Sequence, residues 1–351
     1  MALPSLTAKP VRLAVVGLGQ WGPNLLRTLT NDPRCDVAYV VDRDPNRLAL
    51  VAHRYPNAQL DTSIMHPLDD PTVRAFVIAT PATTHYDIGR RALQAGKDCL
   101  IEKPFTTNLV QAEELAALAR DRELVLAVGH VFLYNAAVRE VKSYVDSGAL
   151  GELRYVSMVR TNLGPPGMDV DVLWDLLAHD VSIANYWLGT KAREVAAHGG
   201  SWITRGKTDT VFATLRYPLG QLVHMVASWL NPRKARDIVA VGSRLMVTLD
   251  DLNSAEPLRI YDKGIDAVAA PVFADTFGEF RASVRHGDVR IPRIVMGEPL
   301  QAECADFVTS VLTREPPHSS GETALSVVET VEALHRSLQH GGILTTLAAD
   351  P

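Results

Sequence analysis

The sequence predicts an α/β domain with a parallel sheet, followed by an α+β domain whose sheet is mainly antiparallel. In the first third, short apolar runs alternate with helical patterns, which is typical of a parallel sheet covered on both faces. After about Gly129, strand patterns joined by turns dominate. At roughly 150 residues per domain, 351 residues also suit about two domains. We expect the domains to be residues 1–128 and 129–351.

The first domain is expected to alternate strands and helices in chain order. Its short apolar runs predict strands at Val11–Val16, Val37–Val41, Ala75–Ala79, Cys99–Ile101 and Leu124–Val128. Its amphipathic stretches predict helices at about Pro23–Asn31, from about Asn46, at His85–Ala95 and at Leu109–Arg120. Helices of this length between strands are the crossovers that parallel pairing requires.

The second domain is expected to open and close on helices that flank a sheet. The opening helix runs over about Ala137–Ser147, with Gly148 as its C-cap, and the closing helix has Ser319 and Glu322 spaced as a capping box and Gly341-Gly342 as its stop. Alternating residues in Thr210–Tyr217 place Val211, Ala213, Leu215 and Tyr217 on one face. A turn at Pro218–Gly220 makes a hairpin with Gln221–Leu230, and the antiparallel sheet continues through Arg236–Val241 and Leu245–Leu249.

Composition argues against several classes of protein. The net charge is −5, from 35 Lys and Arg against 40 Asp and Glu, so a nucleic-acid or anionic-membrane partner is not expected. No apolar run approaches the roughly 18 residues of a membrane span, and residues 1–10 lack the apolar core of a signal peptide. The cysteines Cys35, Cys99 and Cys304 form no C-x-x-C, and no H-x-x-x-H occurs. We therefore expect a cytoplasmic protein with no metal site.

The segment Gly17-Leu18-Gly19-Gln20-Trp21-Gly22 is a G-x-G-x-x-G directly after a predicted strand and at the start of a helix. In this pattern the first glycine allows a tight turn and the second lets the backbone approach a pyrophosphate. The third glycine packs the helix against the strand, and the helix N-terminus attracts the phosphates. The position at the first strand-to-helix turn predicts dinucleotide binding.

Asp42 follows the second predicted strand, 25 residues after Gly17. A carboxylate here can accept hydrogen bonds from both ribose hydroxyls and repels a 2′-phosphate, which favours NAD over NADP. The neighbouring Arg43 leaves NADP open, because it can pair with that phosphate or stack on adenine. The alternative is that Asp42–Pro45 is a solvated turn.

Two further loops follow strands of the predicted parallel sheet, where open α/β sheets bind ligands. Thr80-Pro81-Ala82-Thr83-Thr84-His85 follows one strand, and Glu102-Lys103-Pro104 follows the next. Lys103 can donate a hydrogen bond to a substrate oxygen beside a nicotinamide ring. The alternative for such a tripeptide is an ordinary surface turn.

These motifs, with Ser147–Glu152 and Glu298-Pro299-Leu300, resemble the glucose–fructose oxidoreductase/inositol dehydrogenase (Gfo/Idh/MocA) family over nearly the whole chain. The resemblance implies a Rossmann domain, a second domain with an open, mainly antiparallel sheet, and a nicotinamide cofactor bound between them. It implies homodimers or homotetramers formed through that sheet, and catalysis by Lys103. The expected cofactor contacts are Gly17, Gly19, Gln20, Trp21, Gly22, Asp42, Arg43, Thr80, Pro81, His85, Glu102 and Lys103.

The segment Trp174–Asp180 predicts a helix with Asp175 and His179 at i and i+4, on one face. An imidazole titrates near pH 6.5, which suits removal of a carbinol proton. The alternative is a surface pair without a function. The resemblance favours catalysis, because inositol dehydrogenase-like members carry a catalytic Asp and His at this spacing. Asp180 is expected to cap or pair structurally.

The remaining candidates concern the substrate. His130 follows the last strand of the first domain and lines a cleft or lies in the core. The resemblance suggests further contacts from Tyr134, Asn135, Arg160, Asn162 and Trp174. The cations of Arg233-Lys234-Ala235-Arg236 either bind a phosphate or belong to a solvated hairpin turn.

We therefore expect an NAD(P)-dependent oxidoreductase that transfers hydride between nicotinamide and a secondary alcohol or ketone of a sugar. Trp174–Asp180, Ser228–Leu230 and Asp250–Leu252 resemble the branch that acts on nucleotide-linked amino sugars at C3. Two alternatives stay open: a free inositol or aminocyclitol dehydrogenase, and a regulator that binds dinucleotide without turnover.

Overall fold

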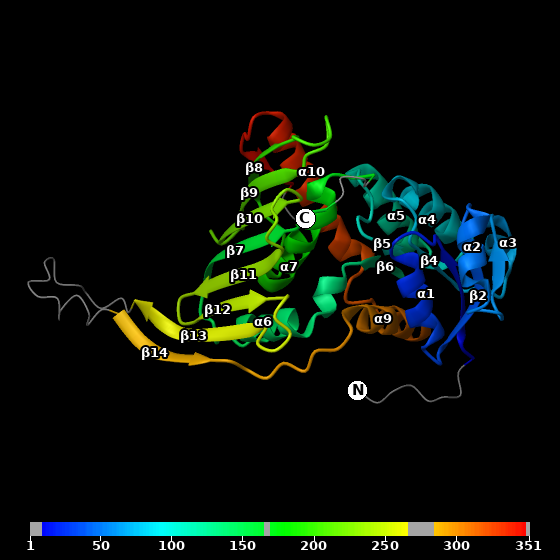
Figure 1. The fold of residues 1–351 in the computed structure, drawn as a ribbon, viewed down its shortest axis with the longest axis horizontal. Coiled ribbons are helices and arrows are strands. Elements are labelled where there is room, and N and C mark those ends of the chain that lie inside the picture. The colour runs from blue at the N-terminus through cyan, green and yellow to red at the C-terminus, as the bar shows by residue number, and fades with distance from the viewer. Residues whose placement is uncertain (1–8, 165–168, 266–283, 349–351) are drawn as a thin grey trace, which may run out of the picture. The chain divides into compact units, whose positions relative to one another are not determined.

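The computed structural model describes residues 9–164, 169–265 and 284–348. The chain forms two compact units, and each is made of two chain segments (Figure 1). The first unit contains Met1–Tyr134 and Gly297–Glu329, and the second contains Asn135–Met296 and Thr330–Pro351. Each unit therefore differs from the contiguous domains expected at residues 1–128 and 129–351. Those domain bounds stay a prediction.

The first unit contains the parallel sheet that the sequence predicts. All neighbouring strands pair parallel, in the order β3-β2-β1-β4-β5-β6. The strands are β1 (Val11–Val16), β2 (Cys35–Val41), β3 (Gln59–Asp61), β4 (Ala75–Ile78), β5 (Asp98–Glu102) and β6 (Leu126–Gly129). Strand β3 and helix α3 (Met65–Asp69) have only three and five residues, too few for a hydrophobic period to predict them. Because the strands are parallel, their carboxyl ends meet at one edge.

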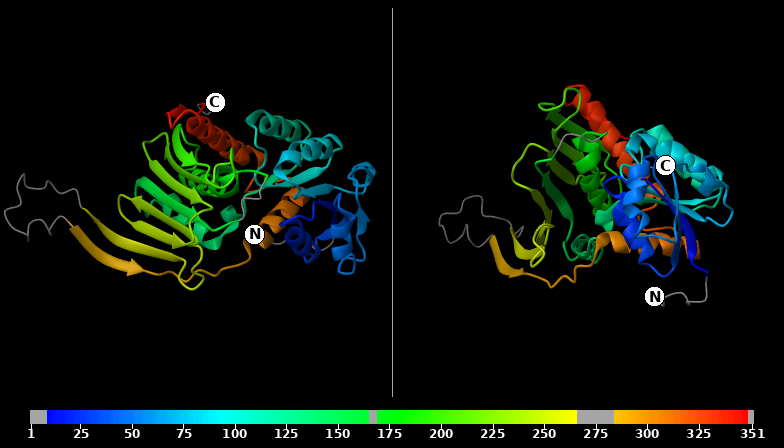
Figure 2. Two further views of the ribbon diagram at one scale, coloured as in Figure 1. Left: turned by 45° about the horizontal axis from the view of Figure 1, so that its top comes forward. Right: turned by 45° about the vertical axis from the view of Figure 1, so that its right-hand side comes forward.

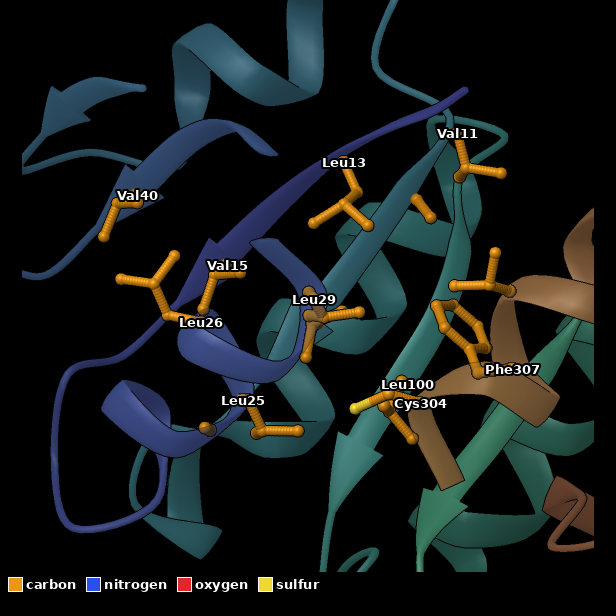
Figure 3. Packing of buried hydrophobic residues seen from close by; sticks show 14 of the residues in the cluster. Val11, Leu13, Val15, Leu25, Leu26, Leu29, Val40, Leu100, Cys304 and Phe307 are labelled. Carbon is orange, nitrogen blue, oxygen red and sulfur yellow. The ribbon is translucent and has the colours of Figure 1, made fainter. Parts of the chain in front are cut away.

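Helices cover both faces of this sheet. In Figure 1, α4 and α5 lie together on one face, whereas α1 and α9 lie on the other. The helices are α1 (Gly22–Thr30), α2 (Pro45–Ala52), α4 (His85–Gln94), α5 (Leu109–Asp121) and α9 (Pro299–Thr313), with 3₁₀ turns η1 (Ala82–Thr84) and η2 (Val131–Tyr134). Figure 3 shows Phe307 and Cys304 of α9 within the cluster that contains Leu13 and Leu29. A segment from late in the chain therefore completes the core of the first sheet.

The second unit contains a nine-stranded sheet in the order β14-β13-β12-β11-β7-β10-β9-β8-β15. Among the described strands every pair is antiparallel except β7 and β10, which confirms the mainly antiparallel prediction. Its strands are β7 (Leu153–Thr161), β8 (Glu194–Gly200), β9 (Thr210–Arg216), β10 (Leu222–Ser228), β11 (Ala235–Gly242), β12 (Met246–Asp250), β13 (Leu258–Ile265), β14 (Val284–Arg290) and β15 (Thr345–Thr346).

Helices lie on one face of this second sheet (Figure 2). They are α6 (Ala136–Asp146), α7 (Ala178–Leu188), the π-helical turn η3 (Leu173–Leu177) and α10 (Gly321–Gln339), the last of which the two units share. The predicted alternation of β9 is confirmed, since Val211, Ala213 and Leu215 are buried, whereas Phe212 is 49% exposed.

The predicted cap of α10 is wrong by one residue. The hydroxyl of Ser320, not Ser319, accepts a hydrogen bond from the Thr323 N–H at 3.2 Å. Ser319 is fully buried and its hydroxyl donates to the Val128 carbonyl at 2.6 Å, while Glu322 pairs with Arg120. The end of β6 competes for Ser319, a tertiary contact that local spacing does not reveal.

Three plain features bear on the environment of the protein. The cysteines Cys35, Cys99 and Cys304 are all free. In the part of the chain that the structure describes, no helix has the length and apolar character to cross a membrane. The same residues contain no group of three or more His, Cys, Asp or Glu side chains arranged to hold a metal ion.

Candidate active site

The glycine turn between β1 and α1 has the shape that a bound pyrophosphate requires. Gly17 has φ of +97°, and a Cβ there would lie 2.7 Å from the Ala79 carbonyl. A Cβ on Gly22 would lie 1.8 Å from the Gly17 oxygen, whereas a Cβ on Gly19 would meet nothing closer than 3.9 Å. No side chain caps α1, and its first turn carries no acidic residue. The backbone is therefore packed at two glycines and open to a ligand at the third.

Asp42 holds this turn from the end of β2. Its carboxylate is 7% exposed, and it accepts hydrogen bonds from the Leu18 N–H at 2.7 Å and the Asp44 N–H at 2.9 Å. A carboxylate has about four acceptor positions, so two remain for ribose hydroxyls. The sequence analysis missed Arg47, whose guanidinium lies 3.7 Å from the Asp42 carboxylate. Arg43 is exposed.

His85 ties the loops that follow β4 and β5. It is 1% exposed, with Nδ1 2.9 Å from the Pro104 carbonyl and Nε2 2.8 Å from the Thr80 carbonyl. A neutral imidazole donates from one nitrogen only, so both contacts are hydrogen bonds only when the ring is protonated. The ring thus positions Thr80, Pro81 and Pro104, and we infer that its part in cofactor binding is indirect.

Glu102 and Lys103 stand at the carboxyl end of β5, at the same sheet edge as the glycine turn. The Lys103 N–H donates to the Glu102 carboxylate at 3.1 Å, and both side chains are partly buried. Gly129 pairs with Glu102 across β5 and β6, and a Cβ there would lie 2.7 Å from the Glu102 carboxylate. The glycine therefore gives the carboxylate room to fold over the end of β6.

His130 lies directly after β6 and is 2% exposed. Neither ring nitrogen has a hydrogen-bond partner among the described residues. Burial, helped by the nearby Lys103 charge, lowers the pKa of His130 to about 4. Its ring is therefore neutral at pH 7, and its position beside Lys103 suits contact with a polar group of a ligand.

Two residues expected to contact the substrate are engaged within the protein. Tyr134 is 5% exposed, and its hydroxyl donates to Asp306 at 2.8 Å; burial and that carboxylate raise its pKa. Asn135 is 3% exposed and caps α6 by accepting from the Ala137 N–H at 2.9 Å. Both residues therefore support the local structure, and their contact with a ligand stays a prediction.

In the second unit, Arg160 and Asp180 form a buried ion pair. Arg160 donates twice to the carboxylate, from Nε at 2.9 Å and from Nη2 at 2.6 Å. Burial raises the pKa of Asp180, and the Arg160 charge opposes this shift. The expected structural pairing of Asp180 is confirmed, and Arg160 is occupied by it. Asn162, just past the end of β7, is exposed and available to a ligand.

Asp175 and His179 do not lie on one continuous α-helix. Asp175 lies in the π turn η3, whereas His179 lies in the first turn of α7. A π turn is wider than an α turn, so the predicted i,i+4 stacking is altered here. Asp175 accepts a hydrogen bond from the Trp229 indole at 3.2 Å, at the end of β10, and His179 is 8% exposed. Single π turns occur frequently at functional sites.

Residues before η3 fix where this turn begins. The Asp171 carboxylate accepts from the Leu173 N–H at 3.1 Å, and lies 3.2 Å from Nε2 of His335 on α10. The His335 ring also stacks on Trp174, with ring centroids 5.8 Å apart. Trp174 is 7% exposed, so it supports the turn that carries Asp175.

A glycine turn on a parallel sheet, followed by a helix-backed and mainly antiparallel sheet, defines a two-domain dinucleotide-binding protein. Residues 11–130 match the family described as "Oxidoreductase family, NAD-binding Rossmann fold", and residues 138–248 match the "GFO/IDH/MocA C-terminal domain". The chain belongs to the GFO/IDH/MocA oxidoreductase family, and its parallel sheet is an NAD-binding Rossmann domain.

Several relatives match over most of their length. The chain is 28% identical to UDP-N-acetylglucosamine 3-dehydrogenase of Acidithiobacillus ferrooxidans, over 92% of this chain and 98% of that protein. It is 29% identical to scyllo-inositol 2-dehydrogenase (NAD(+)) of Bacillus subtilis, over 80% and 88%. The crystal structure of GenD2 from gentamicin A biosynthesis, in complex with NAD, matches with a TM-score of 0.82 at 27% identity, covering 99% of both chains.

The geometry of Asp42 predicts that NADH binds more tightly than NADPH, because the carboxylate repels a 2′-phosphate. Asp42→Ala should narrow the difference, mainly by weakening NADH. It should also weaken both cofactors modestly, since the Leu18 N–H loses its acceptor. Calorimetric dissociation constants for both cofactors test this. Asp44→Asn is the matched control, because it removes a neighbouring charge while keeping a residue that caps α2. A preference for NADPH would instead assign Arg43 and Arg47 to the phosphate.

Proposed function

We propose that the protein is an NAD-dependent dehydrogenase or ketoreductase of a nucleotide-linked amino sugar, acting at the C3 carbinol. The observation that carries the reaction type is the position of Lys103. Lys103 stands at the sheet edge that also presents the glycine turn, where its backbone N–H donates to the Glu102 carboxylate and its charge helps to keep His130 neutral. A cation there is suited to a reacting oxygen next to the nicotinamide.

The nicotinamide cofactor, when bound, supplies the hydride chemistry. Lys103 donates a hydrogen bond to the carbinol oxygen and stabilises the negative charge that develops on it as its proton leaves. His179 accepts that proton during oxidation and returns it during reduction. Asp175, fixed by the Trp229 indole, orients the imidazole or a neighbouring hydroxyl of the substrate. Oxidation thus yields a ketone, with one hydride and one proton removed from the alcohol.

The preference for a nucleotide-linked sugar rests on one relative and one surface. The relative is the UDP-N-acetylglucosamine 3-dehydrogenase, which matches nearly end to end. The surface is the turn after β10, where Arg233 and Lys234 are exposed. The Thr161 hydroxyl at the end of β7 donates to the Arg233 carbonyl at 2.7 Å, and Trp229 of the same turn holds Asp175. Two cations beside the Asp175 turn suit a diphosphate.

A free inositol or aminocyclitol is the second candidate substrate. The inositol dehydrogenase supports it, since it matches at nearly the same identity as the nucleotide-sugar enzyme. We also propose that the protein is a cytoplasmic homo-oligomer. The face of the second sheet opposite its helices exposes Tyr155, Phe212 and Leu222, which suits burial against another copy.

Lys103→Ala should preserve the fold and the affinity for NAD while removing most turnover. Loss of a donor that strengthens in the transition state costs on the order of 3 kcal/mol, or roughly a hundredfold or more in kcat. Steady-state kinetics at saturating substrate and NADH binding by fluorescence measure the two effects. Lys263→Ala, an exposed lysine of the second sheet, is the control. Unchanged turnover would mean that Lys103 belongs to an ordinary surface turn and takes no part in catalysis.

If His179 accepts the carbinol proton, kcat/KM for oxidation should fall at low pH, because a protonated ring cannot accept. His179→Asn should lose this acid limb and be at least about a hundredfold slower. Asp175→Asn should move the limb to lower pH, because the carboxylate favours the charged ring. His224→Asn, an exposed histidine of β10, should change nothing. An acid limb that survives in His179→Asn would assign the proton to another group.

Substitutions in the turn after β10 should distinguish the two candidate substrates. The double variant Arg233→Gln/Lys234→Gln should raise KM for a UDP-linked N-acetylamino sugar by roughly five- to tenfold, since about 1.4 kcal/mol of binding is tenfold. It should leave KM for scyllo-inositol unaltered. Arg259→Gln, which removes an arginine elsewhere on the same sheet, is the control. Higher kcat/KM with the free cyclitol, insensitive to the double variant, would favour the second candidate.

A further inference from the structure

Glu303 is a buried acid for which the proposed reaction has no use. It lies on α9 beside Cys304 and is 2% exposed. Neither carboxyl oxygen has a hydrogen-bond partner among the described residues. An ionised carboxylate in such a position is strongly disfavoured, whereas a neutral acid costs far less.

Glu303 lies on the helix that covers the face of the sheet from which Glu102 projects. Leu100 of β5 and Cys304 of α9 pack in one hydrophobic cluster (Figure 3), and Glu102 follows Leu100 by two residues, on the same face of the sheet. Glu102 folds over Gly129 at the end of β6, and its charge opposes ionisation of Glu303.

Burial also raises the pKa of Glu102, and Lys103 opposes that shift through its charge and its N–H donor. Of the two acids, only Glu102 is stabilised in its charged form by Lys103. It therefore ionises first, and the second ionisation must place two negative charges together.

We propose that Glu303 and Glu102 form a carboxyl pair that holds one proton at mildly alkaline pH, with the proton on Glu303, and that this pair sets the net charge facing Lys103. Glu303 is a positioning residue in this scheme, since it acts through Glu102. The kinetic consequence rests on the proposed function of Lys103, whereas the protonation of Glu303 does not.

The other charges around the pair reinforce this assignment. Asp306, one turn along α9, also disfavours a charge on Glu303, and burial is the largest cause of the raised pKa of Glu303. Tyr134 is neutral and donates to Asp306. His130 is neutral at pH 7, because burial and Lys103 lower its pKa to about 4.

Arg34 also reaches α9, at the Ala305 carbonyl 3.2 Å away, but its charge is paired with Asp32. Lys103 is the cation whose charge acts on Glu102.

The sign of the pH effect follows from the order of ionisation. Burial raises the pKa of Glu102 to about 7, so above that pH the pair carries one negative charge, which balances the Lys103 ammonium. As the pH rises further, Glu303 loses its proton and the pair carries two negative charges. The attraction of Lys103 for a developing alkoxide then weakens, so the reaction should slow on the alkaline side.

Infrared spectroscopy of the substrate-free protein tests the protonation directly. At a pH well above the pKa of about 7 of Glu102, the wild-type protein should show the carbonyl band of a protonated carboxylic acid that shifts when glutamate is labelled with carbon-13. Glu303→Gln should lose this band. A second variant keeps the test valid if Glu303→Gln folds poorly. In Glu102→Gln the Glu303 band should persist, but on raising the pH it should disappear at least about one pH unit earlier than in the wild-type protein, because the like charge of Glu102 is gone. Absence of the band in the wild-type protein, its survival in Glu303→Gln, or an unshifted titration in Glu102→Gln would overturn the pair.

The pH profile of kcat/KM tests the consequence for Lys103. In Glu303→Gln the pair can carry no more than one negative charge, so the alkaline limb should move upward by at least about one pH unit or vanish. Glu298→Gln makes the same chemical change at the exposed residue that precedes α9 and pairs with Arg27, and should leave the limb in place. If the alkaline limb does not move in Glu303→Gln while the infrared band behaves as expected, the protonated Glu303 is supported but its effect on Lys103 is refuted. Absence of dehydrogenase activity in the wild-type protein would refute the proposed function and leave the infrared result standing.

Discussion

The parallel pairing of six strands is the constraint on which the cofactor site depends. Parallel pairing places the ends of β1, β2, β4 and β5 at one edge, so that Gly17, Asp42, Thr80 and Lys103 meet there despite their separation in the chain. The backbone is packed so closely at this edge that two positions, Gly17 and Gly22, can hold only glycine. A Cβ on Gly17 would strike the backbone after β4, and one on Gly22 would strike Gly17 itself. The glycine turn therefore serves packing within the sheet edge as much as ligand approach.

Most polar side chains that the sequence assigned to the ligand are already engaged within the protein. Asp42 and His85 bond to backbone groups of neighbouring loops, Asn135 caps α6, and Arg160 neutralises Asp180. This is expected physically, because a buried polar group without a partner costs about 1–3 kcal/mol. His130 and Glu303, whose ring nitrogens and carboxyl oxygens have no partner among the described residues, are therefore more informative than side chains that merely occupy a motif. Both belong to the first unit; the Lys103 charge acts on His130, and the Glu102 charge acts on Glu303.

The sequence predicts elements where the signal is local and fails where a distant segment decides. The strands from β1 to β6 are apolar runs bounded by turns, and all but the short, polar β3 are predictable. The glycine turn, Asp42 and the Glu102–Lys103 loop can likewise be located, because each follows a predicted strand. In contrast, no local pattern shows that α9 returns to the first sheet, or that Ser319 is drawn away from its cap by Val128. Arg47 could have been found from its place in the first turn after Asp42.

The π turn at Leu173–Leu177 shows the same limit at the site itself. Spacing alone places Asp175 and His179 on one face, since an α-helix repeats every 3.6 residues. The structure places Asp175 inside a wider turn that ends just before α7, the helix that carries His179, with Asp171 and His335 fixing the start of the turn and Trp229 holding the Asp175 carboxylate. His335 and Trp229 come from α10 and from the end of β10, far from η3 in sequence. The position of Asp175 relative to His179 consequently depends on contacts from separate segments. A motif therefore identifies which residues are present, whereas tertiary contacts determine which of them can act together.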